Sequence, residues 1–98
     1  MLEVRQTAAF REWIDGLADR RATERISQRL ARVGAGLMGD VKSVGGGVWE
    51  LRVDHGPGYR LYFVQRGLIV ILLLCGGTKG TQRRDIQRAR IMAAELES

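Results

Sequence analysis

The spacing of apolar residues changes abruptly at Val41, and this change constrains the fold more than any other feature of the sequence. Before Val41, apolar side chains recur at i, i+3, i+4 and i+7, as in Phe10, Trp13, Ile14 and Leu17, which is the spacing that lines one side of an α-helix. From Val41 onward they alternate with polar residues, which is typical of β-strands. The pattern therefore predicts an α+β fold.

The helical pattern predicts three helices. Thr7 is a suitable N-cap for the first helix, and Asp19 for a second helix that ends near Gly34. Because these two helices are joined tightly, we expect a helical hairpin. A third helix follows from Thr81. The apolar stripes of the second and third helices are Ala22, Ile26, Leu30 and Val33, and Ile86, Ala89, Ala93 and Leu96.

The alternating pattern predicts five strands. Leu2–Arg5 is expected to form a short strand, and turn signals divide the region after Val41 into four more. Leu68–Cys75 is apolar at both parities, which indicates a central strand covered on both faces, and Gly76–Gly80 then breaks the pattern. The predicted order is β-α-α-β-β-β-β-α, a mostly antiparallel sheet with the N-terminal helical hairpin packed on it and a C-terminal helix. The four later strands are expected at Val41–Val44, Val48–Asp54, Gly58–Gln65 and Leu68–Cys75.

Length and composition exclude several classes of protein. The 98 residues predict a single domain, 1–98, with one modest core. The longest apolar run has eight residues, far short of the roughly 20 that a membrane span needs, and the N-terminus lacks the apolar core of a signal peptide. One cysteine and one histidine offer no disulfide and no ligand spacing for a metal. We therefore expect a cytoplasmic protein with no membrane partner, metal or cofactor.

The formal net charge is +5, and 14 of the 16 basic residues are arginine. Arginine grips phosphate bidentately and stacks on bases, so the composition favours a nucleic acid or an acidic protein as partner. A high genomic GC content would also enrich arginine, and solvated helix faces carry similar ridges. The basic residues form one ridge on the second helix, Arg21, Arg25, Arg29 and Arg32, and an arc on the third helix, Arg83, Arg84, Arg88 and Arg90.

Two neighbouring strands carry the residues best suited to binding or catalysis. Parity places Trp49, Leu51 and Val53 on a core face of the strand Val48–Asp54, and Glu50, Arg52 and Asp54 on a polar face. A hairpin symmetric about Gly56 would set Arg52 opposite Arg60, and Glu50 opposite Tyr62. Like charges that face each other are destabilising, so the arginine pair indicates either a nearby carboxylate such as Glu50 or a bound anion.

Two further features could contribute to anion binding. Gly76–Gly80 leads into a helix N-terminus, where free backbone N–H groups favour an anion and Lys79 adds a positive charge. His55 lies at the glycine-rich tip of the predicted hairpin, a position better suited to a docking contact than to a general base.

Together these residues resemble toxins of the RelE/ParE superfamily, specifically the HigB-like branch of addiction-module killer proteins, over nearly the whole chain. The matching segments are Phe10–Trp13, Gly39–Gly45, Trp49–Val53, Gly56–Arg60 and Gly76–Lys79, followed by Gln82, Asp85 and Ile86.

The resemblance implies a bacterial cytoplasmic toxin of a type II toxin-antitoxin system, with an antitoxin partner that is often a helix-turn-helix protein. Many relatives are ribosome-dependent mRNA endonucleases without metal, in which the RNA 2′-hydroxyl attacks the adjacent phosphate. By matched position, Arg52 and Arg60 would bind the scissile phosphate, Lys79 would stabilise developing charge, and Glu50 or Tyr62 would transfer a proton. The remaining candidates for RNA or phosphate binding are Arg83, Arg84, Arg88, Lys42 and His55.

Other interpretations remain open at this stage. Well-studied nuclease relatives place a catalytic tyrosine or histidine after the last helix, whereas this sequence ends at Ser98. A ParE-like toxin that binds DNA gyrase without catalysis, or a basic nucleic-acid-binding module without toxicity, is therefore an alternative. The polar residues of the two strands could also form a purely structural network.

Overall fold

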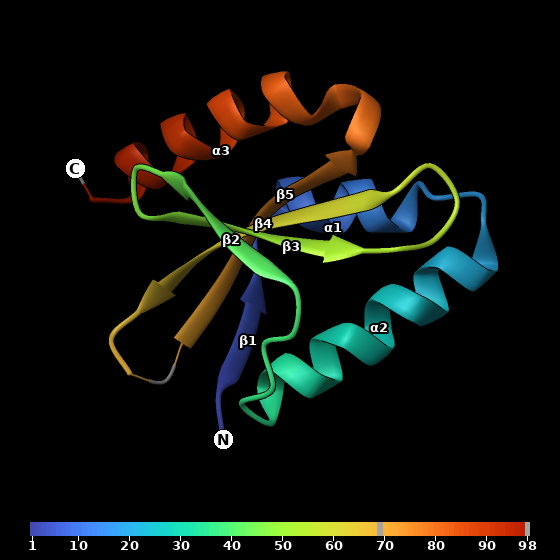
Figure 1. The fold of residues 1–98 in the computed structure, drawn as a ribbon. Helices are drawn as coiled ribbons and strands as arrows, with labels where there is room; N and C mark the ends of the chain where they lie inside the picture. The colour runs from blue at the N-terminus through green and yellow to red at the C-terminus, as the bar shows by residue number, and fades with distance from the viewer. Residues whose placement is uncertain (69, 98) are drawn as a thin grey trace.

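The computed structural model describes residues 1–68 and 70–97, and their elements follow the predicted order (Figure 1). Ile69, which falls within the expected strand Leu68–Cys75, lies outside the described residues. The elements are β1 (Glu3–Gln6), α1 (Ala8–Asp15), α2 (Arg20–Gly34), β2 (Val41–Gly45), β3 (Val48–Val53), β4 (Tyr59–Arg66), β5 (Val70–Thr78), the 3-10 turn η1 (Lys79–Thr81) and α3 (Gln82–Glu97).

The five strands form one sheet in the order β1-β5-β4-β3-β2. β1 runs parallel to β5, and the other neighbours are antiparallel, so the predicted α+β fold with a mostly antiparallel sheet is confirmed. β5 lies inside the sheet and is covered on both faces, as expected, although β4 rather than β5 is the middle strand.

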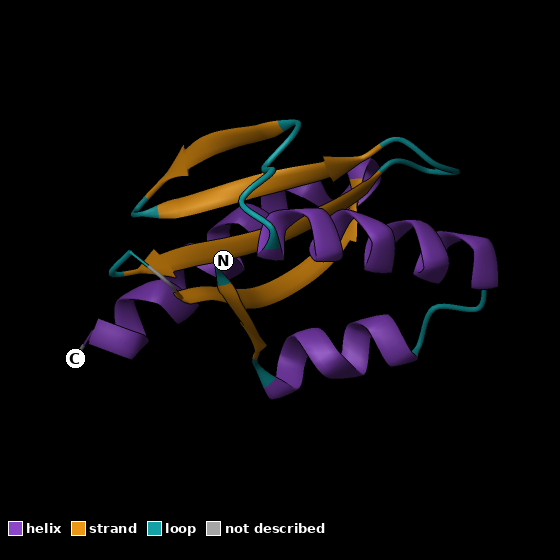
Figure 2. Cartoon of the chain, turned by 90° about the horizontal axis from the view of Figure 1, so that it is seen from below, coloured by secondary structure: helices purple, strands orange, loops and turns teal. Residues whose placement is uncertain are grey.

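Helices cover both faces of the sheet. The helical hairpin of α1 and α2 packs on one face, with Phe10, Ile26 and Val33 fully or almost fully buried against β3, β4 and β5. α3 packs on the opposite face through Ala89 and Ala93, forming a second core. In Figure 2, α2 crosses in front of the sheet and α3 lies behind it.

The predicted caps of the hairpin helices are also observed. The Thr7 side chain accepts a hydrogen bond from the Phe10 amide at 3.1 Å, and the Asp19 carboxylate accepts from the amides of Arg21 and Ala22. These caps satisfy backbone donors that a helix start leaves free, and thereby fix where each helix begins.

The expected end of the last strand at Cys75 is wrong, because β5 continues through Gly76 and Gly77 to Thr78. Both glycines are read in the sequence as breakers, but they are needed for close packing. A Cβ at Gly76 would clash with the ring of Trp13, and one at Gly77 would clash with the Asp85 carboxylate. The absence of side chains at these two glycines therefore lets the Trp13 ring of α1 and the Asp85 carboxylate of α3 lie directly against the β5 backbone, on opposite faces of the sheet.

The face of β3 that was expected to be polar is partly buried in the structure. α3 covers this side of the sheet, so Glu50 is fully buried beside Val48 and Tyr62. Trp49, assigned to the core face by parity, is 39% exposed, whereas Leu51 on the same face is fully buried. Parity identifies the faces correctly, but it does not identify which parts of each face a helix covers.

Within the described part of the chain, no helix combines the length and apolar character needed to cross a lipid bilayer.

Candidate functional site

The hairpin of β3 and β4 brings the predicted polar residues together. Arg52 pairs with Arg60 and Glu50 pairs with Tyr62, which is the register expected from symmetry about Gly56. The turn is possible because Gly56 and Gly58 have φ angles of 55° and 80°, a region that residues with a Cβ rarely adopt. The two guanidinium groups therefore start from directly opposite positions on one face of the sheet.

Glu50 is the centre of a hydrogen-bond network below this arginine pair. Arg52 Nε donates to Glu50 Oε1 at 3.0 Å, and Tyr62 Oη and Gln82 Nε2 donate to Glu50 Oε2 at 3.0 and 2.8 Å. The partners come from both strands and from the first residue of α3. A fully buried carboxylate with this many donors is held in one orientation.

The network keeps Glu50 ionised. Burial alone would raise the pKa of Glu50, but hydrogen bonds from Gln82, Arg52 and Tyr62, together with the charge of Arg52, lower it below the ordinary value of 4.5. Burial and the neighbouring Glu50 charge both raise the pKa of Tyr62 far above its ordinary value. At neutral pH the pair is therefore a carboxylate and a protonated phenol, and neither has access to solvent.

Arg60 is less well satisfied than Arg52. Its Nη1 donates to the Tyr59 carbonyl at 3.3 Å, and its Nε lies 4.0 Å from Glu50 Oε1, too far for a hydrogen bond. Arg60 Nε is buried without a hydrogen-bond partner, although the whole side chain is 12% exposed. One carboxylate therefore cannot hydrogen-bond both arginines, and the buried Arg60 Nε is left without an acceptor.

These arginines open into a cleft of about 400 Å³ at the end of the hairpin. Lys79 reaches it from η1, which is tied to the hairpin turn because the Lys79 amide donates to the Gly58 carbonyl at 2.7 Å. Of the five candidates expected to be catalytic, the structure brings Arg52, Arg60 and Lys79 to the cleft and encloses Glu50 and Tyr62 behind it. The lining residues are Asp40, Arg52, Asp54, Gly56, Pro57, Gly58, Arg60 and Lys79.

Three residues of this site are not identified from the sequence as functional. Asp40 and Asp54 supply the exposed carboxylates of the cleft, and Gln82 orients Glu50. Asp54 shares the parity of Arg52, which is a usable signal. Asp40 precedes β2 and is placed beside Arg52 by the antiparallel pairing of β2 with β3, in which the Arg52 amide donates to the Asp40 carbonyl at 3.0 Å. Gln82 lies far from the β3–β4 hairpin in sequence, and only the packing of α3 brings it there.

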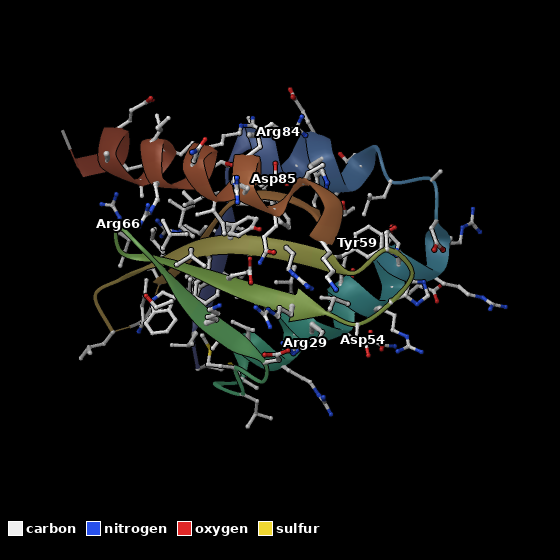
Figure 3. All side chains as sticks on the ribbon, turned by 45° about the horizontal axis from the view of Figure 1, so that its top comes forward. Arg29, Asp54, Tyr59, Arg66, Arg84 and Asp85 are labelled. Atoms are coloured by element: carbon white, nitrogen blue, oxygen red, sulfur yellow. The ribbon has the colours of Figure 1, made fainter. Side chains whose placement is uncertain are left out.

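The candidates on α3 and β2 lie away from the cleft. The exposed side chains of Arg83, Arg84, Arg88 and Lys42 line neither this cleft nor the larger cavity that adjoins it. Figure 3 shows Arg84 on α3, well separated from Asp54 at the end of β3.

The helix start that was expected to attract an anion has a negative group of its own. Asp85 lies in the first turn of α3, is almost fully buried and accepts a hydrogen bond from Thr81 Oγ1. The Thr81 hydroxyl also accepts from the Thr78 amide at 3.2 Å. The favourable interaction between an anion and the helix N-terminus is thus provided within the chain.

His55 holds the hairpin tip against α2. Its Nε2 lies 3.1 Å from Asp19 Oδ2, and its ring stacks on Tyr59 with the centroids 6.5 Å apart. The contact with His55 contributes most to lowering the pKa of Asp19. The Asp19 carboxylate thus both caps α2 and anchors the turn that borders the cleft.

Among the side chains that the structure describes, residues 1–68 and 70–96, no group of three His, Cys, Asp or Glu is placed to hold a metal ion.

Fold and cleft together define a small basic α+β protein with a cleft lined by two arginines and a lysine. Residues 12–95 match the model of the phage-derived Gp49-like proteins, and the chain belongs to this family. The family is part of the RelE-type superfamily of addiction-module killer proteins, which implies a cognate antitoxin. A protein of Haemophilus influenzae described as uncharacterized is 41% identical over 95 residues, covering 97% of this chain and 96% of that protein.

Proposed function

We propose that the protein is the toxin of a type II toxin-antitoxin module of the HigB-like branch, and that it acts in the bacterial cytoplasm as a ribosome-dependent mRNA endonuclease. The observation that carries this proposal is that Arg52, Arg60 and Lys79 line one cleft. Three cationic groups that converge on a small cleft suit a phosphodiester, whose charge increases in the transition state.

In the proposed reaction, the 2′-oxygen of the RNA attacks the adjacent phosphorus and the bond to the 5′-oxygen of the next nucleotide breaks. The products are a 2′,3′-cyclic phosphate and a 5′-hydroxyl, and the leaving 5′-oxygen takes its proton from water. Arg52 and Arg60 bind the non-bridging oxygens, and Lys79 stabilises the charge that develops on them.

Proton transfer in this scheme requires groups that the substrate can reach. Asp40 and Asp54 are exposed carboxylates in the cleft, so we assign the acceptor of the 2′-hydroxyl proton to one of them. Glu50 and Tyr62, the earlier candidates, are enclosed and fully engaged with each other. We assign them, with Gln82, to holding the arginines in position.

The antitoxin is expected to carry a helix-turn-helix domain and an acidic segment that covers the basic cleft or the neighbouring α3 around Arg83. This expectation follows from the net charge of +5 and from the superfamily to which the chain belongs.

The proposal is tested by adding the purified protein to a cell-free translation reaction and mapping new mRNA 5′ ends by primer extension. Cuts should appear only while the message is translated. Arg60→Ala should reduce the cleavage rate by about 10²–10³-fold, as for loss of one preorganised donor to a developing charge. Arg66→Ala is the matched control, because Arg66 lies at the far end of the same strand and is exposed.

Circular dichroism must first show that both variants are folded. Uncut messages with folded wild-type protein would overturn the nuclease proposal, and inhibition of supercoiling by purified DNA gyrase would then support the ParE-like alternative. Binding of RNA or DNA without cleavage or gyrase inhibition would instead support a simple binding module.

A further inference from the structure

A second, larger cavity of about 610 Å³ adjoins the cleft, and the proposed reaction does not use it. We call it the α2 groove. Arg25, Arg29 and Arg32 follow one another at helical spacings of four and three residues, which places them on one face of α2. The α2 groove is lined by Arg25, Gln28, Arg29, Arg32, Asp40, Arg52, Val53 and Asp54.

The arginines of the α2 groove are available for an external anion. In the part of the chain that the structure describes, Arg25, Arg29 and Arg32 have no carboxylate within 4.0 Å. Four arginines line the groove against two aspartates, so its charge is positive. Three of the four arginines of the expected ridge therefore form one wall of a cavity, whereas Arg21 does not line it.

One of these arginines is held in place before any ligand binds. Arg29 Nη2 donates to the Met38 carbonyl at 3.2 Å, and its guanidinium lies against Gly39, where a Cβ would approach Nη1 to 2.6 Å. Gly39 also has a φ of 69°, which brings the chain back along α2. Figure 3 shows Arg29 near Asp54, and both residues line the groove.

The α2 groove and the cleft form one continuous depression, because Asp40, Arg52 and Asp54 line both. We propose that the α2 groove binds the phosphate backbone of single-stranded RNA next to the phosphate that lies in the cleft. This inference rests on the proposed function, since it extends the path of the same strand. A volume of this size accommodates a ligand of one or two nucleotides and is too small for a duplex.

An RNA strand fits these observations better than an acidic peptide does. A strand bound in the cleft must leave it, and the α2 groove is the adjoining cavity with arginines at intervals along its wall. Arginine binds phosphate oxygens through paired N–H groups, and stacking of bases on guanidinium planes adds affinity without sequence preference.

The test measures binding rather than cleavage. Fluorescent 2′-O-methyl RNAs of about three and about nine nucleotides are titrated with the protein by anisotropy at several salt concentrations. The wild-type protein should bind the longer RNA more tightly. Arg25→Gln combined with Arg32→Gln should weaken binding of the longer RNA about tenfold and leave the shorter RNA unaffected. The slope of log K against log salt should become shallower by about 1.4, or about 0.7 for each lost phosphate contact.

The matched control is Arg11→Gln combined with Arg66→Gln, which removes two exposed charges outside the groove and the cleft. Equal effects of the two double variants, or tighter binding of a duplex than of the single strand, would overturn the inference. The inference would also be overturned if binding of an oligoglutamate peptide depended on Arg25 and Arg32 while binding of RNA did not. If Arg60→Ala leaves binding of both RNAs unchanged but the groove variant loses the length dependence, the groove stands and the proposed cleft chemistry fails.

Discussion

Glu50 shows how a single residue can organise a site that it does not itself form. It lies behind the cleft, and the Arg52 side chain on its cleft side is one-third exposed. Because Glu50 Oε1 is closer to Arg52 than to Arg60, the shared carboxylate fixes Arg52 and leaves Arg60 with a free donor. The asymmetry between the two arginines therefore originates in the position of one buried charge.

Glu50→Gln tests this role through stability. Because the pKa of Glu50 is lowered in the folded state, the ionised group stabilises the fold fully above its ordinary pKa of 4.5, and this contribution is lost as the pH falls through the lowered value. The variant should lose about 3 kcal/mol near neutral pH, the lower end for breaking a buried ion pair, since Arg52 is partly exposed.

The measurement is urea unfolding of both proteins near pH 7 and near pH 3, where the difference should shrink. Glu12→Gln, at an exposed site on α1, is the control and should change stability little at either pH. A difference that does not depend on pH would mean that the Glu50 charge does not stabilise the fold.

Much of this site follows from the sequence, because a hairpin obeys local rules. The glycines around Pro57 and the alternation of apolar residues suffice to pair Arg52 with Arg60 and Glu50 with Tyr62. The contribution of Gln82 does not follow, because it depends on where α3 crosses the sheet. The position of that crossing is set by packing between residues remote in sequence, and local periodicity carries no information about such contacts.

At the scale of elements, the junction between β5 and α3 determines where Lys79 and Gln82 lie. Gly77 of β5 is buried beneath the start of α3, close to the Asp85 carboxylate and the Thr81 hydroxyl. Glycine in this segment is readily interpreted as a turn signal, which is why the strand was expected to end too early. Glycine can occur because a turn needs its backbone freedom, or because close packing leaves no room for a side chain. A single sequence does not distinguish these two reasons.

Gly77→Ala should destabilise the protein by about 1–3 kcal/mol, because the added methyl group forces the Asp85 side chain and the start of α3 to move. Thermal or urea unfolding measures the effect. Gly80→Ala is the control, since a Cβ there meets only the Thr78 hydroxyl at 3.6 Å, and this change should be neutral or slightly stabilising. Equal stability of the two variants would contradict the proposed tight approach.

At the scale of the whole molecule, two cores hold one sheet between helices on opposite faces (Figures 1 and 2). The basic groups of the cleft and the α2 groove form a continuous surface, whereas Arg83, Arg84 and Arg88 line neither cavity. The fold class follows from the change in hydrophobic period. The division of arginines between these surfaces does not, since it depends on which helix covers which face.

The second core also contains the single cysteine of the chain. Cys75 is 1% exposed beneath α3, and burial raises the pKa of its thiol to about 11. A thiol reagent in solution therefore cannot reach a reactive thiolate while α3 is in place.

The rate at which Cys75 is labelled consequently reports how often α3 detaches from the sheet. The rate at which an aromatic disulfide reagent labels Cys75 should be far below that of a free thiol and should rise in Gly77→Ala, with no engineered probe required. Rapid labelling of the folded wild-type protein would show that α3 leaves the sheet often. Slow labelling would give the opening frequency of the helix that carries Gln82, and hence how long the Glu50 network persists between openings.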